Sequence, residues 1–203
     1  MLKFSLKYLV LLSALSVFPL SSSAQTSNSA KDSTADTVAR PHENELASAD
    51  EAFLKKAAEA GHAEVEAGKL SQQKASSSDV KGFAEHMVTD HTKVNDELKT
   101  LATNKGAEVP TGPSSAQQAE LKALGEESEQ FDKQYVDRMA VTAHEEAVNM
   151  FKDASEKSED VDVETFAQNT LPSLESHLDM AKSLKAKVSG DKWFHDSQMG
   201  SLL

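Results

Sequence analysis

The chain has 203 residues, of which 33 are Asp or Glu and 21 are Lys or Arg, so its formal net charge is −12. A negative surface repels phosphates, and no cluster of Lys and Arg offsets this repulsion, so the composition argues against a nucleic-acid partner. The absence of cysteine removes disulfides, thiolate nucleophiles, zinc-finger sites and iron–sulfur ligation together.

Residues 1–24 have the order of a secretory signal peptide. Lys3 and Lys7 precede an apolar run over Tyr8–Leu20, and small residues then lead to a cleavage point after Ala24. The apolar run is too short to cross ~30 Å of hydrocarbon as a helix. We therefore expect an exported protein of the periplasm or cell envelope, with no transmembrane segment after signal removal. An uncleaved membrane anchor is the alternative.

The remainder of the chain divides into two polar ends and one body. Residues 25–48 are rich in Ser, Thr, Asn and Asp and cannot bury enough apolar surface to offset their ordering entropy, so we expect a disordered leader. Residues 189–203 show no helical periodicity and are predicted to form a loose tail. Between them, residues 49–188 are predicted to form one helical domain, long enough for a hydrophobic core.

The first two predicted helices make a hairpin. One helix is expected over about 49–73, with Ser48 as its N-cap and Glu64 on its inward stripe. A run of three serines separates it from a second helix, over about 79–104. The apolar positions of this second helix have the 3-4-3-4 spacing that is typical of a bundle seam, and His91 lies on that seam.

The second predicted pair follows a loop and a short helix. Gly and Pro residues over 105–113 predict the loop, and the short helix is expected near 116–124. A third long helix is predicted over about 127–157, then a Ser-Glu-Asp turn, then a fourth helix over about 163–188. Pro172 lies inside the fourth helix and is expected to kink it, because proline removes one backbone hydrogen bond.

This order of elements predicts an all-α fold made of two antiparallel hairpins. Short turns close each hairpin, whereas a long crossover that carries the short helix joins the two. One long crossover is typical of ferritin-like four-helix bundles, since an up-down-up-down bundle needs only short loops. We therefore predict a ferritin-like four-helix bundle, with a three-plus-two arrangement of helices as the alternative.

Polar side chains occupy inward positions on all four long helices. His91 and His177 lie on their seams, His144 lies on the inward face of the third helix, and Glu64 lies on that of the first. An apolar stripe covers roughly a third of a helix, so three inward histidines are unexpected by chance. Glu64 and His91 lie at similar distances along their helices from the first hairpin turn, and so do His144 and His177 from the second. Within each pair the two distances agree to ~3 Å at 1.5 Å per residue. We predict that the four residues meet near the middle of the bundle.

Such a cluster favours a metal site. Three neutral imidazoles and one carboxylate suit a single divalent ion of Zn, Fe, Mn or Cu. Asp90, next to His91, is a candidate further ligand or an acceptor for an imidazole N–H. The alternative is a metal-free polar core in which the same groups satisfy one another. His62 and His86 lie beside the seams, four residues before acidic side chains, and are interpreted as solvated partial ion pairs.

A set of short motifs resembles a known bacterial family. The motifs are Phe53, Glu64-Val65-Glu66, Met87-Val88-Thr89-Asp90-His91, Phe131-Asp132, Tyr135, Val141-Thr142-Ala143-His144 and Leu171-Pro172-Ser173-Leu174-Glu175-Ser176-His177. In this order, over about residues 50–185, they are similar to the exported domain-of-unknown-function family 4142. The resemblance implies a ferritin-like bundle in the cell envelope, often labelled an outer-membrane protein, with no assigned reaction.

The sequence contains no motif that assigns a catalytic activity. The sequence shows no nucleophile with an adjacent base, no Gly-rich phosphate loop and no hydrolase signature. Di-iron bundles use Glu-x-x-His on two helices, but Val88 and Leu174 stand three residues before His91 and His177, which disfavours a ferroxidase. Two functions fit: a periplasmic metal-binding bundle, or a non-enzymatic envelope or stress-response interaction module with a metal-free polar core.

Overall fold

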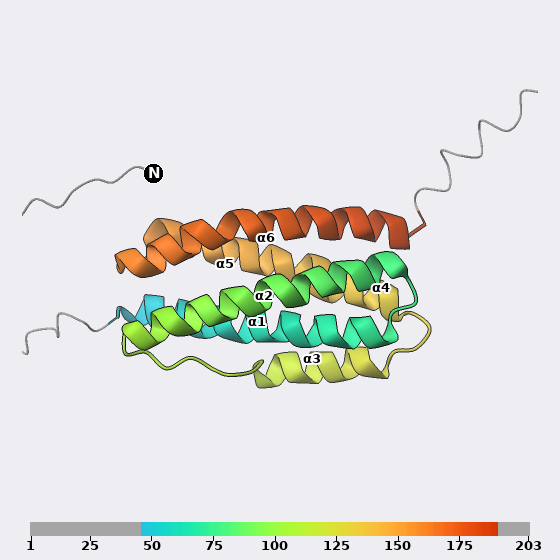
Figure 1. Ribbon diagram of the computed structural model, residues 1–203, viewed down its shortest axis with the longest axis horizontal. Coiled ribbons are helices and arrows are strands. Elements are labelled where there is room, and N and C mark those ends of the chain that lie inside the picture. Colours follow the sequence, from blue (N-terminus) through green and yellow to red (C-terminus); the bar gives the residue numbers. More distant parts are fainter. Residues whose placement is uncertain (1–45, 191–203) are drawn as a thin grey trace, which may run out of the picture. The chain divides into compact units, whose positions relative to one another are not determined.

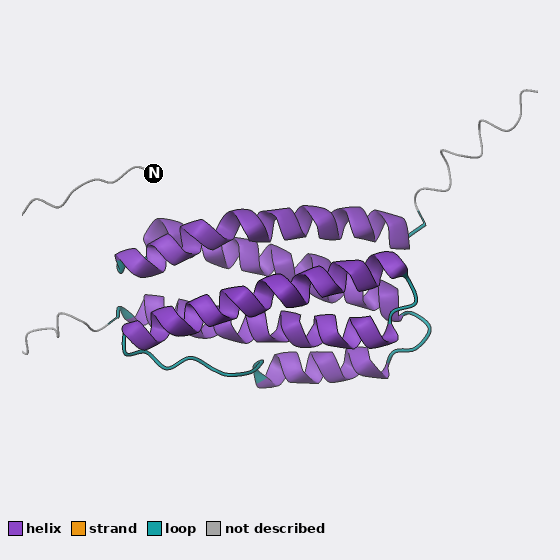
Figure 2. Cartoon of the chain, in the orientation of Figure 1, coloured by secondary structure: helices purple, strands orange, loops and turns teal. Residues whose placement is uncertain are grey.

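A computed structural model describes residues 46–190, and within this range the secondary structure is helical, with connecting turns and loops (Figure 2). The predicted signal peptide at 1–24 lies outside the described residues, as do most of the predicted leader and of the predicted tail. No helix in the described range combines the length and apolar character needed to cross a membrane.

The first hairpin consists of α1 (Ser48–Lys74) and α2 (Ser78–Asn104). The predicted N-cap at Ser48 is wrong by one residue, because the N–H of Glu51 bonds the carbonyl of Ala47 at 3.0 Å and Ser48 is already helical. At the start of α2, the Ser77 hydroxyl accepts the N–H of Val80, as expected of an N-cap.

The two helices of this hairpin approach each other closely at Gly68. A Cβ atom built there would lie 2.9 Å from the carbonyl oxygen of Ala84 and 2.6 Å from a methyl carbon of Val88. The absence of a side chain at Gly68 therefore allows α1 and α2 to pack this closely.

The crossover carries α3 (Ser115–Glu126), close to the short helix that the sequence predicts. A capping box starts this helix, because Ser114 accepts from the backbone of Gln117 while the Gln117 side chain accepts from the backbone of Ser114. The helix packs on the outer side of α1 (Figure 1) and also contacts the start of the second hairpin.

The second hairpin differs from the prediction in one helix. The expected regular helix over 127–157 is divided into α4 (Phe131–Tyr135), a π-helical segment η1 (Val136–Thr142) and α5 (Ala143–Lys157). It begins late because Glu127 is extended and ends α3. The last helix, α6 (Val161–Val188), runs through Pro172 as one continuous element.

Each of the long helices α1, α2, α5 and α6 packs on two of the others. Besides the pairing within each hairpin, α2 packs on α6 and α1 packs on α5 (Figure 1). Buried apolar residues fill two clusters along the helices. The first cluster contains Ala67, Ala75, Val80, Phe83, Ala84, Met87, Leu121, Leu124, Phe131, Tyr135, Val136, Met139, Ala140, Val141, Ala181 and Leu184. The second contains Phe53, Leu54, Ala57, Ala58, Leu98, Ala102, Phe151, Ala154, Val163, Ala167 and Leu174.

Each hairpin turn is held by an aspartate of the other hairpin. Asp50 of α1 accepts the backbone N–H groups of Glu159 and Asp160 at 3.1 and 2.9 Å, in the turn between α5 and α6. Asp132 of α4 accepts those of Ser76 and Ser77, the latter at 2.8 Å, in the turn between α1 and α2. These reciprocal carboxylates satisfy helix-end donors that have no partner inside their own helices.

Candidate metal centre

A polar layer separates the two apolar clusters. On each of four helices, one of the buried polar residues lies between members of the two clusters: Glu64 on α1, His91 on α2, His144 on α5 and His177 on α6. All four residues are buried, with exposed fractions of 5, 5, 1 and 3 %. The prediction that these four side chains point into the helical domain is therefore correct. Their binding of a metal stays a prediction.

The three imidazoles stand close enough to share one ion. His91, His144 and His177 each offer a nitrogen, and the three nitrogens lie within 4.8 Å of one another. The Nε2 atoms of His91 and His144 are 3.3 Å apart. Two ligands with Zn–N bonds of about 2.0–2.1 Å at a tetrahedral angle are separated by about 3.3 Å, so this pair already has the separation that a metal requires.

The π segment fixes the orientation of the His144 ring. His144 is the second residue of α5, which follows η1, and its Nδ1–H donates to the carbonyl oxygen of Met139 in η1 at 3.4 Å. A proton on Nδ1 leaves the lone pair on Nε2, which is the nitrogen that faces His91. The backbone of the second hairpin thereby presents a metal-binding nitrogen toward the cluster.

Asp90 contacts the cluster through His177. Its Oδ2 atom accepts from Nε2 of His177 at 2.9 Å. The other ring nitrogen, Nδ1, is buried and has no partner among the described residues. Of the two roles predicted for Asp90, the structure favours the acceptor that orients an imidazole and leaves its second nitrogen for a metal.

Glu64 lies beside the three histidines without bonding to them. Its Oε1 is 3.8 Å from Nδ1 of His144, which is too long for a hydrogen bond, and neither carboxyl oxygen has a partner in the described part of the chain. Burial raises the pKa of Glu64 to about 8. The residue approaches the Nδ1 side of His144, so its role as a ligand stays a prediction.

Burial also sets the charge of the imidazoles. It lowers the pKa of His91 well below the usual range, assisted by the neighbouring His144 and His177. It lowers that of His144 to about 4, again with a contribution from His177. The pKa of His177 is lowered by burial against the opposing effect of Asp90. All three rings are therefore neutral near pH 7, and neutral imidazole is the form that binds metals.

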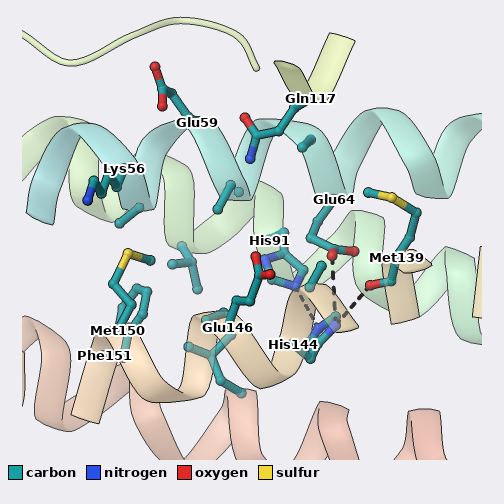
Figure 3. A pocket seen from close by; sticks show the side chains of 18 of the residues that line it. Lys56, Glu59, Glu64, His91, Gln117, Met139, His144, Glu146, Met150 and Phe151 are labelled. Atoms are coloured by element: carbon teal, nitrogen blue, oxygen red, sulfur yellow. Dashed lines mark hydrogen bonds and ion pairs between the residues drawn. The ribbon is translucent and has the colours of Figure 1, made fainter. Parts of the chain in front are cut away.

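A cavity of about 250 Å³ reaches this layer from the surface (Figure 3). Its inner wall includes Glu64, His91 and His144, while Met139, Met150 and Phe151 supply apolar lining. Toward solvent, α1, α3 and α5 contribute the polar side chains Lys56, Glu59, Gln117, Glu120 and Glu146. Three of these are carboxylates, so a cation entering here meets a predominantly negative mouth.

Sequence reasoning missed the surroundings of two residues in this region. His86 lies 3.4 Å from the Asp90 carboxylate and its ring centroid is 5.4 Å from that of His177. Its proximity to Asp90, one helical turn away, agrees with the sequence-based interpretation, but the contact with α6 depends on how two helices rotate against each other. Tyr135 is buried with a hydroxyl that has no partner among residues 46–190, and burial together with the charge of Glu64 raises its pKa. In the sequence, Tyr135 stands out only as one of the family motifs.

Residues 35–184 match the model of a protein family described as "Domain of unknown function (DUF4142)". The chain belongs to this family. No curated protein matches the sequence. Solved structures similar to this DUF4142 domain include a DUF305 fragment from Deinococcus radiodurans, 14% identical, with a TM-score of 0.60 over 70% of this chain and 99% of that one. Another is CopM in the Cu(II)-bound form, 19% identical, with a TM-score of 0.58 over 68% and 96%. At these identities the likeness establishes a shared helical fold.

Proposed function

We propose that this DUF4142 chain is an exported metal-binding protein whose His91, His144 and His177 hold one transition-metal ion. The observation that carries the proposal is the convergence of three buried imidazole nitrogens, from three different helices, to within 4.8 Å of one another. Buried polar groups need partners, and a shared cation satisfies all three lone pairs at once. The surrounding architecture in this proposal is a ferritin-like four-helix bundle.

Copper(II) is the ion we assign to this site. Among divalent first-row ions, copper has the highest affinity for a nitrogen-rich site of this kind. The structurally similar CopM was solved with Cu(II) bound, which supports the same choice. Bound copper would supply Lewis acidity and one-electron redox chemistry. The chain's own contribution is to hold three neutral imidazoles in place, to orient His177 through Asp90, and to limit access of water.

Export of the chain is a further part of the proposal. In this proposal the signal peptide predicted at 1–24 directs the mature protein to the periplasm, where it binds copper ions before they enter the cell. The expected mass of the exported protein corresponds to a chain that begins at Gln25. A full-length chain retained in membranes would contradict this part of the proposal.

Copper titration tests the site directly. Metal-free protein at pH 7 is expected to bind one equivalent of Cu(II) tightly, with a nitrogen-rich signature in its electron paramagnetic resonance spectrum. His91→Gln and His144→Gln should each weaken binding strongly, because each removes one of three ligands. His62→Gln is the matched control, since His62 is a histidine of α1 outside both potential metal-binding groups. Equal binding by all four proteins would contradict the proposal.

One observation favours a different function. The 3.3 Å separation of the His91 and His144 Nε2 atoms also suits a hydrogen bond between two neutral rings. In that case the layer is a metal-free polar core, and the chain acts as a non-enzymatic envelope or stress-response module. Absence of tight copper binding, together with intact folding, would select this second function.

A further inference from the structure

A second group of potential ligands adjoins the buried triad on the α2–α6 side. It consists of His86, Asp90 and His177, which each offer one atom within 4.8 Å of the others. Asp90 Oδ2 is the central atom, 2.9 Å from Nε2 of His177 and 3.4 Å from Nε2 of His86. One carboxylate oxygen and two imidazoles make a mixed oxygen and nitrogen site for a divalent transition-metal ion.

This second group is open to solvent, unlike the triad. The side chains of His86 and Asp90 are 49 % and 33 % exposed, whereas that of His177 is 4 % exposed. His86 also lines a surface groove between α2 and α6, with Asp79 and Asp179 among its other residues. Ions in bulk water can therefore meet His86 and Asp90 without passing through the cavity that leads to the triad from α1 and α5.

His177 belongs to both groups and has a nitrogen for each. Nε2 faces Asp90, while Nδ1 is buried and has no partner among the described residues. Its ring centroid lies 5.4 Å from that of His86 on one side, and 5.4 and 5.5 Å from those of His91 and His144 on the other. A single ring thus links a solvent-exposed pair of ligands to the buried pair.

We propose that His86, Asp90 and His177 form an outer site that takes a divalent transition-metal cation from solvent and passes it to the triad by ligand exchange at His177. The proposal rests on the proposed function of the triad. In the outer position the ion binds Nε2 of His177 and the ring proton is on Nδ1. In the inner position the ion binds Nδ1, and the proton returns to Nε2 and donates to Asp90. The charge of the ion does not change, and its bonds to Asp90 and His86 are replaced by bonds to His91 and His144.

The direction of transfer follows from the ligands. The outer site takes two of its three ligands, His86 and Asp90, from partly exposed side chains, which lose more conformational freedom when they bind an ion. The inner site offers three buried imidazoles that are already held in place. The inner site should therefore bind the ion more tightly, and the outer site should fill only in passing.

An equilibrium experiment isolates the outer site. In the double variant His91→Gln/His144→Gln, CuCl2 titration should still detect one weakly bound equivalent of Cu(II). Adding His86→Gln should abolish this weak binding, whereas adding the control His62→Gln should preserve it. Circular dichroism verifies that each variant is folded. A weak equivalent that persists without His86, or that is absent from the folded double variant, would overturn the outer site.

A kinetic experiment uses the intact triad and so does not depend on the double variant. After rapid mixing of metal-free protein with CuCl2, His86→Gln should load the triad several-fold more slowly than wild type, with a smaller change in final affinity. His62→Gln should load at the wild-type rate. If tight binding requires His91 and His144 but His86→Gln loads as fast as wild type, the outer site is wrong and the proposed function stands. If wild type binds no copper through the triad, both fail.

Discussion

At the residue scale, burial drives the central acid and bases toward their neutral forms. The pKa of Glu64 rises to about 8, while that of His144 falls to about 4. Although the two side chains approach to 3.8 Å, both are neutral near pH 7 and do not form an ion pair. The stability of the metal-free protein should therefore depend on pH through these two groups in opposite directions.

The alkaline side of this dependence belongs to Glu64. Its folded pKa of about 8 is above the ordinary value of 4.5, so the folded state holds a proton that the unfolded state has lost, and stability falls as pH rises toward 8. His144, with a folded pKa of about 4, removes stability only as pH falls below about 6.5. Between pH 6.5 and 8 the wild type should lose up to about 1.4 kcal/mol per pH unit through Glu64. Urea unfolding should show this slope, and Glu64→Gln should remove it; equal slopes in both proteins would contradict the assignment.

The two closest imidazoles should be energetically coupled. His91→Ala should cost about 2–4 kcal/mol, because it opens a void and leaves His144 without its partner. Adding His144→Ala should then cost clearly less than His144→Ala does alone, since neighbours in one network are not additive. Denaturant unfolding of the four proteins in the cycle measures the coupling. The pair His91→Ala and His62→Ala serves as the control and should be additive, and additive behaviour of the first pair would contradict the contact.

At the element scale, the spacing of α1 and α2 depends on a glycine. Gly68→Ala should destabilise the protein, because the new Cβ would lie 2.9 Å from a backbone carbonyl of Ala84 that cannot move independently. Gly82→Ala is a matched control on α2, since nothing lies within 4 Å of its Cβ position, and it should stabilise by about 0.5–1 kcal/mol through helix propensity. Thermal unfolding compares the two variants. Equal effects would show that the helices can separate without cost.

The helices also show how much of the fold can be predicted from the sequence. Clean apolar spacing predicts α2 and its inward His91 within a residue or two, and the turn residues predict both hairpins. In the third helix, the sequence periodicity allows either Met139 or Ala140, and either Ala143 or His144, on the inward stripe. That ambiguity is the trace of η1, because a π segment changes the number of residues per turn and breaks the 3.6-residue period. The apolar periodicity of the sequence alone could therefore not locate this π segment.

The candidate site was predictable only in part. Glu64, His91, His144 and His177 could be selected because a polar residue on an apolar seam stands out in one dimension. The role of His86 could not, because its exposed position resembles that of any surface histidine with an acidic neighbour one turn away. Its proximity to His177 arises from the packing of α2 on α6.

At the scale of the whole molecule, the reciprocal carboxylates of Asp50 and Asp132 join the two hairpins. Asp132→Ala should cost about 1–2 kcal/mol, because the N–H groups of Ser76 and Ser77 lose a charged acceptor. Asp153→Ala, which removes only a surface pair with Lys157 inside one helix, should change stability little. Chemical denaturation distinguishes the two, and a cost for Asp153→Ala as large as that for Asp132→Ala would contradict a special role for the turn contact.

The contacts of Asp50 bear on how long the folded domain lasts. These hydrogen bonds link residues 109 and 110 positions apart in the sequence, so they form only after the two hairpins have packed against each other. Interactions that form after the rate-limiting barrier slow unfolding and leave the rate of folding nearly unchanged. Rapid-mixing kinetics of Asp50→Ala should therefore show faster unfolding with an unaltered refolding rate. On this account the Asp50 carboxylate prolongs the lifetime of the native state once the two hairpins have packed together.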